Sequence, residues 1–322
     1  MATWSNAVKS VAAVDRRRWT ADYKNVIMKR ILKIVAMLAW MTTLPACVSS
    51  TAQDAVEAAE HFNQDWAMHG LWDQGKAEVA QYQAQRVIYG KPRDFEYTLI
   101  LVKETFNQEY KVKTDDYDRD DLFEVMKINK FARIPTDNYP YHYMTSIFYK
   151  RDQPSTVYKL TNSSQEWCGT TAKYFLDKGR RYKFGYNSYW DGQGIGETTV
   201  EGNLMFEDQL SHSLRALNFA DGLTFQQRVA ESQVSSKATI PTIYDATFTV
   251  SAVKSVPLST DYVMNDKGWK VTVRLDSTKT NEYWFDSAYP NILLKQTTWD
   301  RQTLDIKKHY MDNYWVIKEK SL

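Results

Sequence analysis

The sequence contains few cysteines and few glycines, and it has no long apolar run outside its N-terminal segment. Its 322 residues include 12 glycines and two cysteines, Cys47 and Cys168. After Cys47, no apolar run approaches the roughly 20 residues that a membrane-spanning helix needs. Internal repeats and low-complexity linkers are also missing from the sequence, so nothing in the composition marks a domain boundary downstream of the N-terminal segment.

The segment 28–47 has the features of an export signal. Three basic residues precede the uncharged, mostly apolar stretch Ile34–Leu44. A core of roughly 7–15 apolar residues is typical of a secretory signal peptide. The residues Leu44-Pro45-Ala46-Cys47 resemble the lipobox of bacterial lipoproteins, although Pro45 departs from the usual pattern. The resemblance implies cleavage between Ala46 and Cys47 and lipid modification of Cys47, with several acyl chains that together anchor a protein stably.

The N-terminal segment determines how the rest of the chain is divided. We expect residues 1–27 to be a spurious extension, because Met28 offers a second start; a twin-arginine signal containing Arg16–Arg18 is the alternative. Residues 28–46 are then the signal peptide, 47–75 a tether and helix, and 76–322 a single antiparallel β-rich domain. Val48 is not the aspartate that retains lipoproteins at the inner membrane, which favours an outer-membrane anchor with the domain in the periplasm.

Removing residues 1–46 changes the sign of the net charge. The full chain has 41 Lys and Arg against 39 Asp and Glu, and the removed segment holds eight basic and two acidic residues. The remaining 33 basic and 37 acidic residues give the mature chain a net charge of −4. This balance gives no reason to expect a nucleic-acid partner. If Cys47 carries lipid, Cys168 has no intramolecular disulfide partner.

The mature chain is rich in aromatic residues, which favours strands with one buried face. The clearest strand pattern is Gly268–Asp276, where apolar and polar residues alternate. Helical spacing occurs in two places, from Asp54 to about Trp66 and from Leu204 to Leu217. We therefore predict a mainly β fold: a large curved antiparallel sheet or an incomplete β-barrel with two short helices, with a sandwich as the alternative.

Several short segments, in this order, resemble an uncharacterised family of bacterial lipoproteins. Some members of that family carry the label "septum formation inhibitor". The label belongs to a nucleotide pyrophosphatase family with an α/β fold, and this sequence lacks the alternating βα pattern of such enzymes. The likeness covers roughly 76–246 and implies a family without a known activity. Its segments are Ala77-Glu78, Tyr89-Gly90, Val112–Asp115, Val125–Asn129, Tyr141–Phe148, Ser164–Gly169 and Tyr244–Ala246.

Cys168 is the candidate reactive thiol, with His142 or His212 as its base. A thiol reacts readily when its pKa is lowered, and the sequence offers only Glu166 nearby, which would raise it. A free cysteine between a tryptophan and a glycine is more often packed in a core, and we expect this for Cys168. We therefore assign no catalytic residue.

Other groups of polar residues do not match known sites. Asp116, Asp118 and Asp120 lack the glycine and glutamate that an EF-hand requires, and the five histidines show no metal spacing. We therefore predict neither a metal site nor a cofactor. The aromatic residues of 139–143 and 182–186 could line a ligand groove, although cross-strand packing is the commoner role of such residues.

The sequence favours a membrane-anchored, non-catalytic lipoprotein that binds a ligand or associates with the envelope. Its expected partners are the membrane, through the lipid on Cys47, and either an apolar ligand or an envelope protein. A thiol-dependent envelope enzyme that uses Cys168 is the alternative, and a passive assembly factor in an outer-membrane complex is a third hypothesis.

Overall fold

The computed structural model describes residues 59–264 and 267–316. The predicted extension, signal peptide, cleavage site and lipidated Cys47 therefore lie outside the described residues. The predicted helix at 54–66 lies partly outside them. All the described residues belong to one compact unit.

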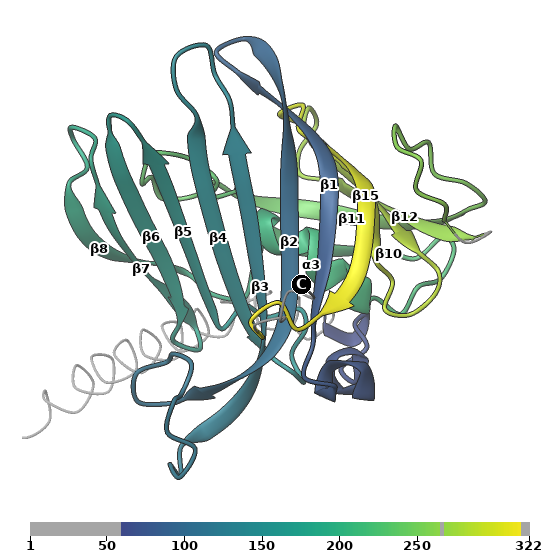
Figure 1. The fold of residues 1–322 in the computed structure, drawn as a ribbon, viewed down its shortest axis with the longest axis horizontal. Helices are drawn as coiled ribbons and strands as arrows, with labels where there is room; N and C mark the ends of the chain where they lie inside the picture. Colours follow the sequence, from purple (N-terminus) through teal and green to yellow (C-terminus); the bar gives the residue numbers. More distant parts are fainter. Residues whose placement is uncertain (1–58, 265–266, 317–322) are drawn as a thin grey trace, which may run out of the picture. The chain divides into compact units, whose positions relative to one another are not determined.

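Fifteen strands form one sheet (Figure 1). From one edge to the other their order is β8 down to β1, followed by β15 down to β9, so the two halves of the chain meet where β1 pairs with β15. All neighbouring strands run antiparallel except β9 and β10, which are parallel. The strands are β1 (Ala77–Ile88), β2 (Lys91–Asn107), β3 (Leu122–Ile134), β4 (Tyr141–Lys150), β5 (Lys159–Glu166), β6 (Gly169–Asp177), β7 (Arg181–Ser188), β8 (Ile195–Glu201), β9 (Met205–Phe206), β10 (Thr224–Ala230), β11 (Ile243–Val253), β12 (Gly268–Arg274), β13 (Thr280–Asp286), β14 (Leu293–Thr297) and β15 (Thr303–Asp312).

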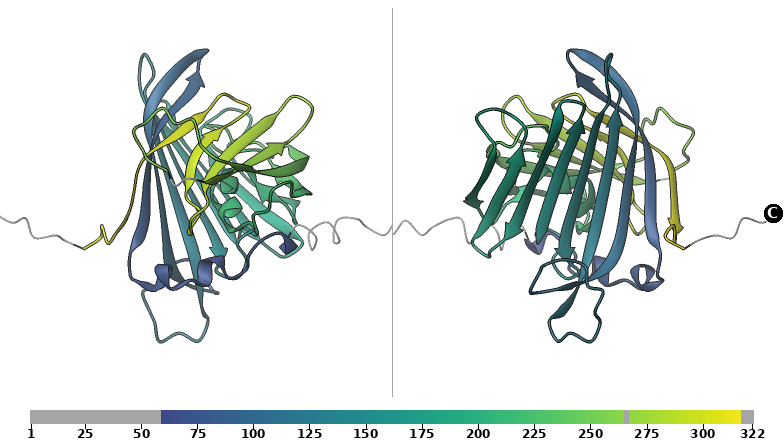
Figure 2. Two further views of the ribbon diagram at one scale, coloured as in Figure 1. Left: turned by 90° about the vertical axis from the view of Figure 1, so that its right-hand side faces the viewer. Right: turned by 60° about the vertical axis from the view of Figure 1, so that its left-hand side comes forward.

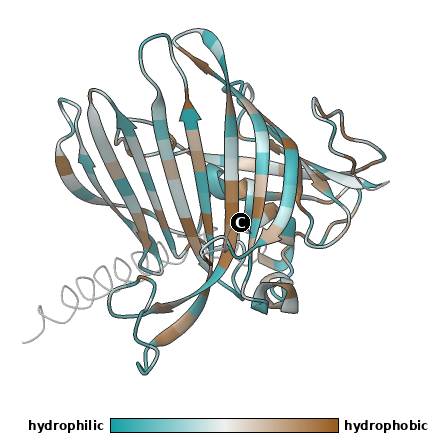
Figure 3. Ribbon diagram, viewed as in Figure 1, coloured by the Kyte–Doolittle hydropathy of each residue, from teal (hydrophilic) through white to brown (hydrophobic). Residues whose placement is uncertain are grey.

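Alternation of apolar and polar residues explains why these segments form half-buried strands (Figure 3). In β4, Tyr141, Tyr143, Ile147 and Tyr149 are buried on the inner face, whereas His142 and Met144 are exposed on the outer face. The strand predicted at Gly268–Asp276 is confirmed as β12. The predicted mainly β fold with a large curved sheet is also confirmed.

The sheet curls without closing. Its two arms, β1–β8 and β9–β15, enclose the helix α3 (Glu207–Ser213), as the views of Figure 2 show. Irregular pairing at Gln81/Tyr82 and at Trp284/Phe285 adds local bends that favour curvature. The strands at the two ends of the sheet order, β8 and β9, are not paired with each other among the described residues. A side-chain ion pair between Glu201 of β8 and Arg228 of β10 connects the two arms.

The helix predicted at Leu204–Leu217 is confirmed in its central part. Residues Glu207–Ser213 form α3, and Leu214–Ala216 continue as the 3₁₀ helix η3, but Met205–Phe206 form strand β9. Every residue of α3 is buried. Most side chains of α3 are polar, and buried polar groups are normally hydrogen-bonded. The residues around α3 must therefore supply hydrogen-bond partners.

The helix predicted from Asp54 to about Trp66 is wrong after Glu60. Ala59 and Glu60 are helical, but Phe62 then forms a β-bridge with Leu217. The chain continues in the short 3₁₀ helices η1 (Trp66–Met68) and η2 (Gly70–Asp73). One backbone bond of this segment reaches η3, where Asn63 N donates to Ala216 O at 2.7 Å, and local bonds such as Trp66 N to Asn63 O at 3.2 Å form the short turns.

Candidate functional site

A polar cavity of about 460 Å³ lies between the inner face of the sheet, the start of α3 and the segment 231–241. The segment 231–241, called the strap below, connects β10 to β11 and forms part of the cavity wall. The strands β1, β2, β3, β6, β13 and β14 each contribute lining residues, so the cavity exists only because the sheet curls. The charged lining residues are Arg86, Lys130, Lys173, Lys237, Glu207, Asp208, Glu231 and Asp300.

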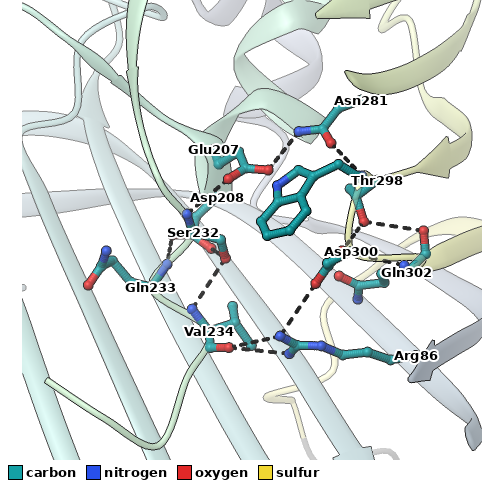
Figure 4. A network of polar contacts seen from close by, with 11 residues as sticks. Arg86, Glu207, Asp208, Ser232, Gln233, Val234, Asn281, Thr298, Asp300 and Gln302 are labelled. Carbon is teal, nitrogen blue, oxygen red and sulfur yellow. Dashed lines mark hydrogen bonds and ion pairs between the residues drawn. The ribbon is translucent and has the colours of Figure 1, made fainter. Parts of the chain in front are cut away.

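The first turn of α3 holds the strap through two carboxylates (Figure 4). Glu207 Oε2 accepts a hydrogen bond from the backbone N of Ser232 at 3.0 Å. Asp208 accepts from Ser232 Oγ at 2.8 Å and from Gln233 N at 2.7 Å. Carboxylates are also favoured in the first turn of a helix, where the unpaired backbone N–H groups carry partial positive charge.

Two cations hold the strap from the side of the sheet. Lys173 Nζ, on β6, donates to the carbonyl oxygens of Gln233, Ser235 and Lys237 at 2.7, 3.1 and 2.8 Å. Three carbonyl acceptors use all three N–H donors of an ammonium group, so this geometry indicates the protonated form. Arg86, on β1, donates through both terminal nitrogens to Val234 O at 3.2 Å, and one of them lies 3.6 Å from Asp300 Oδ2 (Figure 4).

Burial changes the protonation behaviour of three cavity residues. It raises the pKa of Glu207 to about 7, although hydrogen bonds from Asn281 Nδ2 and from the backbone of Ser232 oppose the shift. It lowers the pKa of Lys130 and of Lys173 to about 8. Lys130 Nζ donates to Ser211 Oγ at 2.6 Å and to the carbonyl of Asp208, which places its charge beside α3. The cavity therefore contains groups that titrate close to neutral pH.

The structure corrects the prediction that Cys168 is packed in the core. Cys168 is exposed in the short turn between β5 and β6, and its thiol contacts the hydroxyl of Tyr139 at 3.4 Å. The two histidines proposed as bases are not brought to it. His142 is on the outer face of β4, and His212 is fully buried in α3, where it bonds to the hydroxyl of Tyr149.

The aromatic residues predicted as a groove lining are divided between two strands that are not neighbours. Tyr141 stacks on Tyr143 in β4, and Phe184 packs against Tyr186 in β7, while β5 and β6 separate the two pairs. None of the predicted rings lines the polar cavity, which instead includes Tyr97 and Tyr283, but Tyr186 and Tyr139 line two other hollows of about 640 and 370 Å³. Most of these rings belong to the hydrophobic core.

Sequence reasoning missed the cavity residues Arg86, Lys130, Lys173 and Glu207. One signal was present, because Lys173 stands between the inward positions Thr171 and Phe175 of β6 and is itself buried. A lysine at an inward position of an alternating strand indicates a buried polar partner, since an isolated charge is rarely buried. The partner could not be identified from the sequence, because the strap lies about sixty residues further along the chain.

Two features are absent from the described residues: a cluster of metal-binding side chains and a membrane-spanning helix. Within residues 59–264 and 267–316, no group of three or more His, Cys, Asp or Glu side chains is arranged to hold a metal ion. No helix in the same ranges is long and apolar enough to cross a membrane.

Comparison with known proteins does not assign the chain to a family. No protein-family model matches the sequence, and no curated protein matches it. Two solved structures are similar in part. One is a β-barrel-like protein of the domain of unknown function DUF1849 from Brucella abortus, with 11% identity, a TM-score of 0.44, and coverage of 74% of this chain and 98% of that chain. The other is a DUF1089 family protein from Pseudomonas aeruginosa, with 11% identity, a TM-score of 0.28, and coverage of 60% and 87%. At this level of similarity, neither structure assigns a function to the chain.

Proposed function

We propose that this chain is a lipid-anchored protein of the bacterial envelope that binds a small polar molecule in the cavity under the strap. The observation that carries the proposal is the cavity itself, about 460 Å³ in volume and lined by charged, hydroxyl and amide groups. Protein interiors are otherwise closely packed, and binding sites for small molecules are commonly preformed hollows of about 300–1,000 Å³.

Binding is favoured over catalysis because six of the eight charged side chains around the cavity already have protein partners. Glu207, Asp208 and Lys173 hold the strap, and Arg86 is bonded to Val234 and lies near Asp300. Groups engaged in this way shape a site, but they are poorly placed to exchange protons with a substrate. The thiol of Cys168, the alternative reactive group, is not among the residues that line the cavity.

The polar lining favours a polar ligand over the apolar ligand expected from the sequence. An apolar molecule would remove water from hydroxyl and amide groups without replacing their hydrogen bonds, which costs roughly 1–3 kcal/mol for each such group. The lipid on Cys47 remains the proposed link to the membrane. It is supported by the lipobox-like residues Leu44-Pro45-Ala46-Cys47 and by the apolar segment before them.

A matched pair of alanine substitutions tests the cavity. Ala132, on the inner face of β3, lines the cavity, whereas Ala172 is exposed on the outer face of β6. The variant Ala132→Phe places a ring in the cavity, and Ala172→Phe adds the same ring outside it. Native mass spectrometry of the mature protein, after incubation with a small-molecule extract of bacterial cells, should show a bound polar molecule on the wild type and on Ala172→Phe but not on Ala132→Phe. An adduct that persists on folded Ala132→Phe, or no adduct on any of the three, contradicts the proposal.

A further inference from the structure

The charges around the cavity are balanced in number. Four basic side chains and four acidic side chains line it. A site built for an anion or a cation normally has an excess of the opposite charge, because that excess offsets the loss of water from the ligand. This cavity has no such excess.

The charged groups are also largely used by the protein itself. Lys173 has three carbonyl partners, and each carboxylate oxygen of Glu207 and Asp208 accepts a hydrogen bond. A charged ligand would have to replace bonds that hold the strap in place. Breaking a buried hydrogen bond to a charged group leaves its partner without a hydrogen bond. The free energy lost exceeds the free energy gained from a new hydrogen bond to a neutral group.

The neutral lining groups include several without a hydrogen-bond partner. Among the described residues these are the hydroxyl of Tyr97 and the side-chain amides of Gln296 and Gln302, while Lys130 uses two of its three donors. The half-buried Glu231 and the exposed Lys237 also have no side-chain hydrogen bond there, and their opposite charges cancel. Tyr97, Gln296 and Lys130 line the cavity from the strands β2, β14 and β3, and Gln302 lines it from the turn that precedes β15. Together they offer donors and acceptors in the mixture that a molecule with several hydroxyl groups requires. The partly exposed indole of Trp299 also lines the cavity, and the ammonium group of Lys279 lies over its ring at 4.1 Å from the centroid.

From this arrangement we propose that the cavity binds a neutral, polyhydroxylated molecule, a sugar or polyol of mono- or disaccharide size, through Tyr97, Gln296 and Gln302. The inference rests on the proposed binding function of the same cavity. The balanced charges of the lining disfavour a charged ligand, and the free neutral groups favour one with several hydroxyl groups.

Calorimetric titration of the mature protein tests the class of ligand. The protein is kept in a detergent without a sugar headgroup, since such a headgroup would compete. The neutral probes are glucose, N-acetylglucosamine, trehalose, sucrose and myo-inositol. The charged probes are glucose 6-phosphate, citrate and glutamine, the last being zwitterionic. We expect at least one neutral probe to bind and all the charged probes to bind more weakly.

Variants connect the binding to the named groups. Tyr97→Phe and Gln296→Leu each remove hydrogen bonds to the ligand and should weaken the neutral probe by about tenfold, as expected for a lost bond in a site shielded from water. Ala172→Phe should bind the probe as the wild type does. Gln302→Leu provides a further substitution if one of the others fails to fold, which thermal melting detects.

The outcomes separate this inference from the proposed function. Preferred binding of a charged probe that Ala132→Phe abolishes overturns the sugar or polyol class but leaves the binding function standing. Failure of all the neutral probes also overturns the class, and the extract experiment above then decides the binding function separately. Neutral-probe binding that survives both Tyr97→Phe and Gln296→Leu unchanged places the ligand elsewhere and overturns the inference.

Discussion

Glu78 and Arg215 form an ion pair that is almost completely withdrawn from solvent. Their side chains are 1% and 2% exposed, and the two guanidinium–carboxylate bonds measure 2.8 and 2.7 Å. Arg215 also donates to Pro290 O at 3.0 Å and lies over the ring of Trp66. Burial alone would raise the pKa of Glu78, but Arg215 and His309 together more than offset this effect and the pKa falls to about 2. The pair fixes η3, and with it α3, against β1.

Glu78→Gln should destabilise the protein by about 3–5 kcal/mol at pH 7, because it leaves the buried charge of Arg215 without compensation. Urea unfolding measures the loss. The control is Glu197→Gln, which breaks the exposed pair with Lys183 and should have a far smaller effect because solvent screens that pair. Equal losses in the two variants would show that the buried pair has no special role.

Glu207 should make stability depend on pH near neutrality. The pKa of its carboxyl rises from 4.5 to about 7 in the folded protein, so the folded state holds a proton that the unfolded state releases. The resulting stabilisation is complete below pH 4.5 and is lost as the pH rises through 7. The variant Glu207→Gln cannot ionise, so its loss of stability between pH 5 and pH 7 should be smaller than that of the wild type by about 2 kcal/mol.

Urea unfolding at both pH values measures this difference. Glu197→Gln serves as the control, because Lys183 lowers the pKa of Glu197 below 4.5 and moves its titration out of the window. Parallel pH profiles of the wild type and Glu207→Gln would rule out a raised pKa at this carboxyl.

At the scale of elements, the strap depends on a lysine from the opposite arm of the sheet. Lys173→Met removes three hydrogen bonds to strap carbonyls while keeping the length and most of the apolar volume of the side chain. We expect hydrogen exchange of the strap amides to accelerate by about tenfold or more, since each carbonyl left without a partner costs about 1–3 kcal/mol.

Lys183→Met is the matched control for this exchange experiment. Lys183 is on the neighbouring strand β7, and it pairs with Glu197 at the surface, away from the strap. Its removal should leave strap exchange unchanged. Unaltered exchange in Lys173→Met would mean that the carboxylates of α3 hold the strap without the lysine.

Elements with a continuous pattern could be predicted, whereas contacts between arms could not. Apolar and polar residues alternate along Gly268–Asp276 because one face of the strand is in contact with water. This alternation can be recognised within nine residues of sequence. Cys168 was placed wrongly because the residues beside it do not distinguish a strand interior from a two-residue hairpin turn. The cavity was missed for a different reason. Arg86, Lys130, Lys173 and Gln296 converge only after the sheet curls, and no local spacing encodes how far a sheet curls.

At the scale of the whole described unit, a single meander produces both the cavity and the open edge. Consecutive strands pair in order along each arm, and among the described strands only β1 and β15 pair across a long stretch of sequence. The curl therefore depends on contacts between the arms, namely α3, the strap and the ion pair Glu201–Arg228. Apolar packing also joins the arms, because Phe206 of β9 packs against Phe175 of β6 and Tyr182 of β7 inside one continuous hydrophobic core.

The proposed lipid anchor can be tested with the two cysteines as a matched pair. Metabolic labelling with palmitate should mark the wild type and Cys168→Ala, because Cys47 carries the acyl chains in both. Cys47→Ala should lose the label completely and retain residues 28–46, since the lipid and the cleavage both require that cysteine. Mass spectrometry of the purified chains measures the attached lipid and the N-terminus together. Label on Cys47→Ala, or loss of label from Cys168→Ala, would contradict an anchor at Cys47. At least two acyl chains are expected on the wild type, because one chain alone holds a protein at a membrane only marginally.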